Sequence, residues 1–166
     1  KGQGKKEVVA GDVIVLAGRG PIGSGMEETY QLTSALKFIP WGKEVAIVTD
    51  ARFSGVSTGA CIGHVGPEAL AGGPIGKVID GDRIRIEIDR NQLIGTVDLV
   101  GNGETSFDSK AAAEVLVKRE MNEGIQPDTQ LPADTRLWAA LQSASGGTWG
   151  GCVYDVEKII DRLNEN

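Results

Sequence analysis

The sequence predicts a single α+β domain, because its patterns are ordered and its length suits one core. Strand-like apolar runs dominate the first two thirds of the 166 residues, and helical patterns dominate the last third. This order favours segregated strands and helices over repeated βαβ units. The 24 glycines, about twice the usual share, indicate many tight turns and close backbone approaches. We therefore expect a β-rich core over about residues 8–104 and a helical part over about 108–166.

Several segments of the core have the pattern of strands. The apolar runs 13–17 and 44–49 predict two buried strands. Residues 83–88 alternate strictly between apolar and polar, which predicts a half-buried strand whose partner over 92–100 follows a turn at 89–91. A further short strand is expected within 72–79. The inward side chains of the alternating strand should be Ile84, Ile86 and Ile88.

A helix is expected between the first two strands. Ser24 and Glu27 fit a capping box, in which the serine caps the helix and the glutamate reaches back to it. The helix should continue to about Phe38 and end before Pro40.

Three more helices are expected in the last third. Residues 110–121 are rich in alanine and helix formers, and Asp134 is placed to cap a helix that runs to about Ser143. Asp155 is placed to cap a final helix. Its apolar residues recur at helical spacing, namely Val156, Ile159, Ile160 and Leu163.

Composition excludes several classes of function. A net charge of −6 and the absence of a basic run argue against a nucleic-acid partner. No apolar stretch is long enough for a membrane span and no signal-peptide pattern opens the chain, so we expect a cytoplasmic protein without a membrane partner. The chain opens on a polar lead, residues 1–6, without an initial methionine. We expect it to be part of a longer protein.

Two cysteines are present, Cys61 and Cys152, and they form no CxxC or Cys/His ligand set. We expect both to be buried free thiols of a cytosolic protein. Two cysteines alone cannot hold an iron–sulfur cluster.

The segment from Thr49 to Ala69 is the richest in groups that carry chemistry. It leaves a predicted strand through small residues and contains Asp50, Arg52, Ser54 and the only histidine of the chain, His64. Polar groups on loops held by a rigid scaffold are where binding and catalysis concentrate. We therefore place the candidate site here.

Motifs along two thirds of the chain carry a family resemblance. They are Gly11-Asp12-Val13, Gly20-Pro21 with Gly25-Met26-Glu27-Glu28, the block 50–69, and Gly72-Gly73-Pro74-Ile75 with Asp80-Gly81-Asp82. In these motifs and their order, the chain resembles the C-terminal domain of the dihydroxy-acid, 6-phosphogluconate and sugar-acid (aldonate) dehydratases. Residues 131–138 and 145–149 are most similar to the xylonate dehydratase branch. The resemblance implies a swivelling-type β-barrel with flanking helices.

The resemblance also implies a hydro-lyase activity. It points to the removal of water from a sugar acid, xylonate above others, to give a 2-keto-3-deoxy acid. The cofactors implied are Mg²⁺ and an iron–sulfur cluster whose ligands lie in an N-terminal domain outside this chain. That domain is therefore an implied partner, with a homo-oligomer for the full-length enzyme. The isolated chain is expected to be inactive.

Two residues match the family's reacting groups. Ser54, in Arg52-Phe53-Ser54-Gly55, matches the serine that acts as the base, although a turn serine that bonds its own backbone is the structural alternative. Glu28 matches the metal-binding carboxylate, and such a hard oxygen ligand suits Mg²⁺. Its alternative role is to complement the dipole of the expected helix, which is the role we assign to Glu27.

Four further residues are candidates for substrate binding. Arg52 is placed to bind a substrate carboxylate or to pair with Asp50. Ser57 and Thr58 are placed to bond substrate hydroxyls. His64 is a substrate-binding candidate as well, with a structural histidine and a Ser/His pair with Ser54 as alternatives.

Two functions of other classes remain open from sequence. Gly18, Gly20 and Gly23 form a GxGxxG motif between a predicted strand and a predicted helix, as in a dinucleotide-binding module. Pro21 removes one amide from that turn, and Asp50 lies farther on than the usual acidic residue. The other alternative is a non-catalytic swivelling or interaction domain.

Overall fold

The computed structural model describes residues 7–165, so the polar lead at 1–6 lies outside the described part of the chain. The centre of the core is formed by Val48, Ala69 and Ile75. Around it pack half-buried side chains from both sheets and from the loops, namely Val13, Val15, Ala17, Ile62, Val65, Ile86 and Ile125. Within residues 7–165, no helix is both long and apolar enough to cross a membrane.

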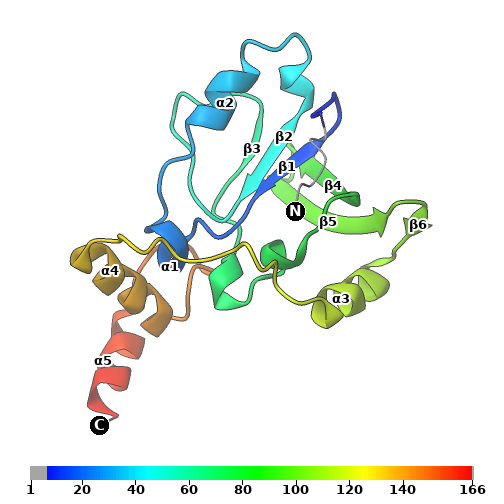
Figure 1. The fold of residues 1–166 in the computed structure, drawn as a ribbon. Coiled ribbons are helices and arrows are strands. Elements are labelled where there is room, and N and C mark those ends of the chain that lie inside the picture. The colour runs from blue at the N-terminus through cyan, green and yellow to red at the C-terminus, as the bar shows by residue number, and fades with distance from the viewer. Residues whose placement is uncertain (1–6, 166) are drawn as a thin grey trace.

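The first sheet is parallel and has three strands in the order β1-β2-β3. Strand β1 spans Val13–Leu16, β2 spans Ala46–Thr49 and β3 spans Ala60–Ile62. Figure 1 shows them side by side, with β2 in the middle. The first two strands confirm the apolar runs. The third was not predicted, because its three residues follow a glycine-rich loop and carry almost no pattern.

The second sheet is an antiparallel hairpin with a short third strand. Strand β4 spans Asp82–Asp89, β5 spans Ile94–Asn102 and β6 spans Thr105–Ser106. The predicted alternation and turn are confirmed, and the Asp89 carboxylate caps the turn by accepting from two backbone amides.

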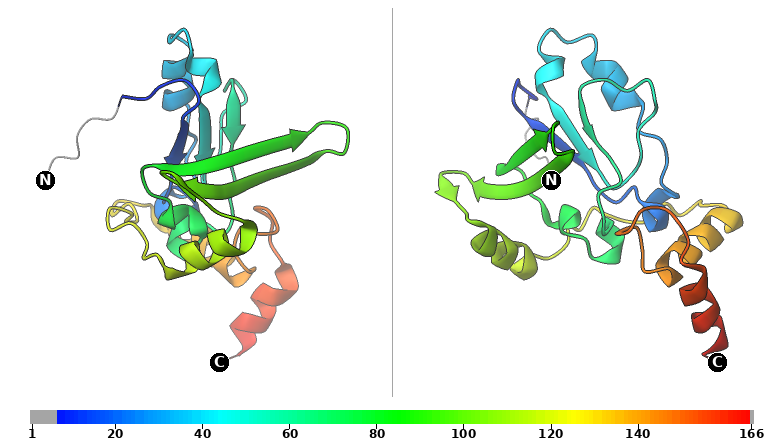
Figure 2. Two further views of the ribbon diagram at one scale, coloured as in Figure 1. Left: turned by 90° about the vertical axis from the view of Figure 1, so that its right-hand side faces the viewer. Right: turned by 180° about the vertical axis from the view of Figure 1, so that it is seen from behind.

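One inward side chain of that hairpin was predicted wrongly. Ile84 and Ile86 are half-buried, but Ile88 is 67 % exposed. The tip of the hairpin reaches past the first sheet, so no core lies under Ile88 (Figure 2).

The expected β-barrel is wrong. The two sheets share no hydrogen-bonded strand pair in residues 7–165, and each remains open. Ile86 of β4 packs against the same core as the strands of the first sheet. The sheets therefore meet through side chains, because strands of only three or four residues in the first sheet cannot tilt and stagger around a closed ring.

The long helix expected after Ser24 is also wrong. Two short helices occur instead, α1 over Pro21–Ser24 and α2 over Gln31–Leu36. Gly25 has a left-handed conformation and Met26 follows with φ 59°, which ends α1 after one turn. The Ser24 hydroxyl donates to the carbonyl of Arg19 and caps nothing, while Glu27 pairs with the Arg19 guanidinium.

Short 3₁₀ turns occupy three connections. They are η1 over Gly42–Glu44, η2 over Ala69–Ala71 and η3 over Pro74–Lys77. The last one replaces the short strand expected in 72–79. Pro74 begins that turn, where its fixed φ suits a helical start and its missing N–H costs nothing.

Three helices complete the fold. Helix α3 spans Ser109–Lys118, α4 spans Ala133–Ala144 and α5 spans Val156–Asn164. Asp155 caps α5 by accepting from the amide of Lys158, as predicted. Asp134 lies inside the first turn of α4 and does not cap it. Helix α4 contacts α1, whereas α5 extends away from the body and buries none of its residues (Figure 1).

Candidate functional site

The carboxylate of Asp50 joins the loops that follow β1 and β2. It accepts hydrogen bonds from the amides of Gly18 at 3.0 Å, Arg19 at 2.9 Å and Ala69 at 2.9 Å. Asp50 is only 1 % exposed. A buried carboxylate needs such donors to offset its lost hydration. Asp50 therefore fixes the glycine-rich loop relative to the end of β2, and it does not pair with Arg52.

Glu68 holds the same loop from the other side. Its carboxylate accepts from the amide of Ile22 at 3.0 and 3.1 Å and from that of Gly23 at 3.4 Å. Burial raises the pKa of Glu68, the two amides lower it, and the charge of Asp50 raises it again, with a net upward shift. A Cβ on Gly20 would collide with the Glu68 side chain, which explains the glycine there.

These carboxylates occupy the amides that a dinucleotide would need. A Rossmann fingerprint offers the N–H groups of its glycine loop and helix start to a pyrophosphate. Here the amides of Gly18, Arg19, Ile22 and Gly23 bind Asp50 and Glu68 instead. A pyrophosphate would have to displace two buried anions, so the geometry disfavours the dinucleotide alternative.

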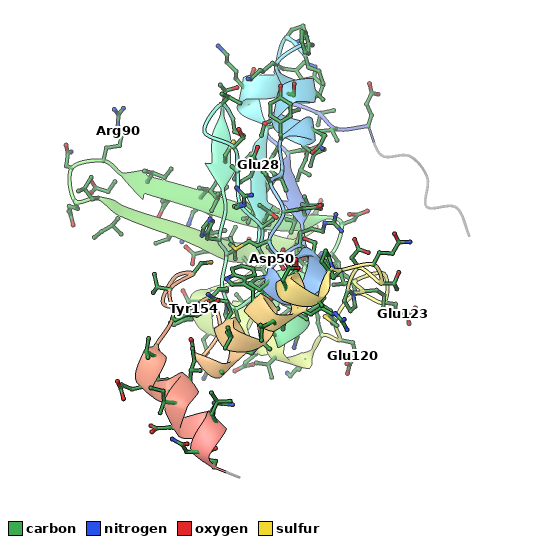
Figure 3. The ribbon with its side chains drawn as sticks, turned by 90° about the vertical axis from the view of Figure 1, so that its left-hand side faces the viewer. Glu28, Asp50, Arg90, Glu120, Glu123 and Tyr154 are labelled. Atoms are coloured by element: carbon green, nitrogen blue, oxygen red, sulfur yellow. The ribbon has the colours of Figure 1, made fainter. Side chains whose placement is uncertain are left out.

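Glu28 and Arg52 are brought together by a parallel β-bridge. The Glu28 Oε2 atom lies 3.4 Å from Arg52 Nη1, and both side chains are about half exposed. The next residue strengthens the pairing, because both the amide and the hydroxyl of Thr29 donate to the carbonyl of Arg52, at 2.9 and 3.0 Å. Figure 3 shows Glu28 on the α2 side of Asp50. Glu28 thus lies in an extended segment, not in a helix.

Ser54 begins a turn just after this bridge. Its carbonyl accepts from the amide of Ser57 at 3.0 Å, and its hydroxyl oxygen accepts from the amide of Val56 at 3.4 Å. The turn is tied to α2, because the Lys37 ammonium donates to the carbonyl of Val56 at 3.0 Å. Ser54 is half-buried, so its hydroxyl is held in place and remains reachable.

The other hydroxyl candidates lie farther along the loop. Ser57 Oγ is 3.2 Å from the hydroxyl of the buried Thr33, so its position is fixed by α2. Thr58 is exposed, and its carbonyl accepts from the Cys61 thiol at 3.5 Å. Ser57 therefore contacts α2, whereas Thr58 contacts β3 through its carbonyl.

His64 lies in a separate cluster with two sulfur atoms. Its Nδ1 atom is 3.9 Å from the Cys152 sulfur, and that thiol donates to the Met26 sulfur at 3.3 Å. The cluster adjoins the bridge, because Arg52 Nε donates to the carbonyl of Met26 at 3.1 Å. Burial raises the pKa of the Cys152 thiol, and the charge of Glu68 raises it further.

Cys61 and Cys152 are both free, as expected, but half-buried rather than fully buried. They come from β3 and from the segment before α5. Residues 7–165 contain no group of three or more His, Cys, Asp or Glu side chains arranged to hold a metal ion.

Two contacts of the site were not predicted from the sequence. Glu68 carried no motif that linked it to the glycine loop, 45 residues earlier. Cys152 and Met26 are 126 positions apart, and nothing local to either residue signals the contact. Burial of an acidic side chain beside a cis Gly66-Pro67 bond is visible only in three dimensions.

Comparisons with known proteins bear on this geometry. Residues 2–147 match the family described as dihydroxy-acid/6-phosphogluconate dehydratase C-terminal. The chain is 58 % identical over 160 residues to D-xylonate dehydratase YagF of Escherichia coli (strain K12), which covers 96 % of this chain and 24 % of that protein. D-xylonate dehydratase YjhG of the same organism is also 58 % identical, over 96 % of this chain and 25 % of its own length.

A more distant relative matches a smaller share. Dihydroxy-acid dehydratase of Mycobacterium sp. (strain JLS) is 46 % identical over 106 residues, which cover 63 % of this chain and 17 % of that protein. The chain thus spans about a quarter of the length of the two D-xylonate dehydratases it matches. With a family match over residues 2–147, the chain belongs to the dihydroxy-acid/6-phosphogluconate dehydratase family, of which it is a C-terminal domain.

Proposed function

We propose that this chain is the part of a sugar-acid dehydratase that carries the base and one metal-binding carboxylate. The reaction would remove water from a 2,3-dihydroxy acid such as xylonate to give a 2-keto-3-deoxy acid. The observation that carries the proposal is the bridge between Glu28 and Arg52, two residues before Ser54. The names of the D-xylonate dehydratases that match 96 % of the chain support the substrate.

Ser54 is proposed to take the proton from C2 of the substrate. A serine hydroxyl is a weak acid, so its alkoxide requires donors or cations close by. The amide of Val56, 3.4 Å from the Ser54 oxygen, is one such donor. The electron pair of the broken C2–H bond forms the C2–C3 double bond, and the C3 hydroxyl group departs as hydroxide. The proton held by Ser54 then converts the hydroxide to water and restores the alkoxide, and the enol that remains tautomerises to the keto acid.

Glu28 is proposed as a ligand of Mg²⁺. Its carboxylate is 43 % exposed, and its only ion-pair partner in residues 7–165 is Arg52. The site fits the ion, because Mg²⁺ in enzymes commonly takes one or two carboxylates and completes its shell with water and substrate oxygens. Bound there, the ion would supply positive charge to the carboxylate of the substrate.

The iron–sulfur cluster does not fit this chain. Clusters are held by sets of cysteines, and this chain has only two, which are both free and lie on different segments. No step of the reaction is therefore assigned to a cluster on these residues. If the cluster serves the reaction, its ligands belong to the N-terminal domain that the resemblance implies as a partner.

Four side chains are proposed to hold the substrate. The Arg52 guanidinium is half exposed and can exchange Glu28 for a substrate carboxylate. Ser57 and Thr58 would bond hydroxyls farther along the sugar acid. His64 would contribute Nε2, because its Nδ1 faces Cys152. Ser57 is half-buried and the other three are exposed, which suits groups that meet a substrate between two domains.

The proposal is tested by assaying a full-length protein that contains this chain. Xylonate should be converted to keto acid in the presence of Mg²⁺, while the isolated 166-residue chain with Fe, sulfide and Mg²⁺ should form none. Keto acid formed by the isolated chain would overturn the proposed division of the site. No turnover of any sugar acid or dihydroxy acid by the full-length protein would favour the non-catalytic swivelling or interaction domain.

A further inference from the structure

A cluster of three donor atoms lies beside the proposed active site, and the proposed reaction does not use two of them. The cluster consists of the sulfur of Met26, Nδ1 of His64 and the sulfur of Cys152. The Cys152 sulfur lies 3.3 Å from the first atom and 3.9 Å from the second. The three residues come from segments far apart in the sequence, the loop after α1, the loop after β3 and the segment before α5.

We propose that Met26, His64 and Cys152 form a binding site for a soft monovalent metal ion, Cu(I) or Ag(I). Thiolate and thioether sulfur select such ions, and imidazole is a common third ligand. Zn²⁺ fits less well, because protein zinc sites use Cys, His and carboxylate ligands rather than a thioether. Mg²⁺ prefers oxygen and is not a candidate here.

The two spacings that involve Cys152 suit three-coordinate binding after a small adjustment. With metal–sulfur bonds of about 2.3 Å and metal–nitrogen bonds of about 2.0 Å at angles of about 120°, the two sulfurs stand about 4 Å apart and sulfur and nitrogen about 3.7 Å. The Cys–His separation of 3.9 Å already matches. The two sulfurs, at 3.3 Å, must separate by well under 1 Å, which rotation of the flexible Met26 side chain provides.

The backbone around the cluster is held in place by hydrogen bonds. Met26 and His64 both have left-handed backbone conformations, with φ 59° and 56°. The amide of Met26 donates to the carbonyl of Gly20 at 3.1 Å, and that of His64 donates to the carbonyl of Ala51 at 2.8 Å. Met26 is 3 % exposed, so its sulfur faces the interior side of the site while His64 gives access from solvent.

Binding needs no oxidant or reductant. The ion enters as Cu(I) or Ag(I), the Cys152 S–H bond breaks, a metal–sulfur bond forms and the proton passes to solvent. Because Arg52 Nε donates a hydrogen bond to the Met26 carbonyl, the ion would lie next to the proposed substrate site. This placement makes the proposed function sensitive to soft metals, although the binding itself does not depend on that function.

The test is a competition titration of the 166-residue chain with Cu(I), with bicinchoninate as the competing chelator and oxygen excluded. The Cys61→Ser variant is the background, because it leaves one thiol in the chain. We expect one Cu(I) per chain. Met26→Leu, which keeps the apolar volume, and His64→Asn, which tolerates the left-handed backbone, should each weaken binding by about tenfold or more, the loss that even an outer-shell partner causes in metal sites.

Cys152→Ser in the same background should remove binding. Circular dichroism and melting temperature verify that each variant keeps the fold of the background, and X-ray absorption should report two sulfur ligands and one nitrogen ligand. Binding that survives Cys152→Ser would overturn the proposal. So would binding that Met26→Leu and His64→Asn leave unchanged, since it would reduce the site to a single thiol. Keto acid formation by the full-length protein is measured separately, so failure of the metal site and failure of the proposed dehydratase are distinguishable.

Discussion

Glu28 and Arg52 face each other across a single parallel bridge, with 3.4 Å between the carboxylate and the guanidinium. The two residues belong to different loops, one that follows α1 and one that follows β2. The pairing brings the proposed metal ligand to within two residues of the proposed base, Ser54. Both charged groups are half exposed, so the pair is weak and open to exchange with substrate or metal.

Replacing Glu28 by Gln should raise the Mg²⁺ concentration needed for half-maximal activity of the full-length protein. The amide keeps the shape of the side chain but loses the charge that a hard cation requires. The melting temperature should hardly change, because an exposed ion pair contributes about 1 kcal/mol or less. The measurement is a Mg²⁺ activation curve with xylonate as substrate.

Glu27→Gln is the matched control for that curve. Glu27 is the neighbouring carboxylate and pairs with Arg19 rather than with Arg52. Its Mg²⁺ curve should coincide with that of the unmodified protein. Equal shifts in both variants, or no shift in Glu28→Gln, would remove Glu28 from the metal site.

Replacing Asp50 by Asn should destabilise the fold by about 2 kcal/mol or more. The buried carboxylate accepts three backbone N–H bonds, and an amide would turn an NH₂ group toward at least one of these donors. Urea unfolding measures the loss. Asp80→Asn is the control, because Asp80 is exposed and should change stability by no more than about 0.5 kcal/mol. Equal stability of both variants would show that the loops do not depend on Asp50.

The pair of Asp82 and Arg119 should make stability depend on pH. Burial raises the pKa of Asp82, but hydrogen bonds from Arg119, the amide of Ile79 and Asn102 outweigh it and leave the pKa below its usual range. Because the folded pKa is depressed, the stabilisation is present above the unfolded pKa of about 3.9. It is lost as the pH falls through the lower folded pKa.

Arg119→Met isolates this contribution. The guanidinium lies 2.5 and 2.9 Å from the Asp82 carboxylate, whose side chain is 1 % exposed. The variant should lose about 3 kcal/mol at pH 7, because it leaves a buried carboxylate without its cation. The difference in free energy of unfolding between the variant and the unmodified protein should become smaller below about pH 4.

Arg85→Met serves as the comparison, since its pair with Asp98 at 3.5 Å is exposed and contributes about 1 kcal/mol or less. Urea unfolding at pH 7 and at acid pH distinguishes the two arginines. If Arg119→Met loses the same free energy of unfolding at both pH values, relative to the unmodified protein, the assigned role of Asp82 is contradicted.

The sequence predicted those elements that have a strong local pattern. The runs behind β1 and β2, the alternation of β4 and the cap of α5 at Asp155 are all signalled within a few residues. The long helix after Ser24 failed, because Gly25 and Met26 take left-handed conformations that only the contacts around them explain. The prediction of a barrel was wrong as well. Strand length and packing decide whether two sheets join by hydrogen bonds or only through side chains.

The candidate site was predictable only in its residue types. Ser54, Arg52 and Glu28 were found through a family resemblance, and the bridge that joins two of them depends on backbone pairing across 24 positions. The binding of Asp50 and Glu68 to the glycine loop inverts the expectation from GxGxxG, because that motif specifies open amides but not which anion fills them. The contact of Cys152 with Met26 has no local signal at all.

The central claim is that Ser54 is the base, and Ser54→Ala in the full-length protein tests it most directly. Its hydroxyl accepts only a 3.4 Å bond from Val56 among residues 7–165, so the melting temperature should stay unchanged. Loss of a catalytic base lowers the rate by about 10²–10⁴-fold, and kcat of Ser54→Ala with xylonate should fall at least that far. The control is Ser57→Ala, in the same loop, which should retain a far larger share of kcat. A near-normal kcat for Ser54→Ala would contradict the account and leave Ser54 as a turn residue.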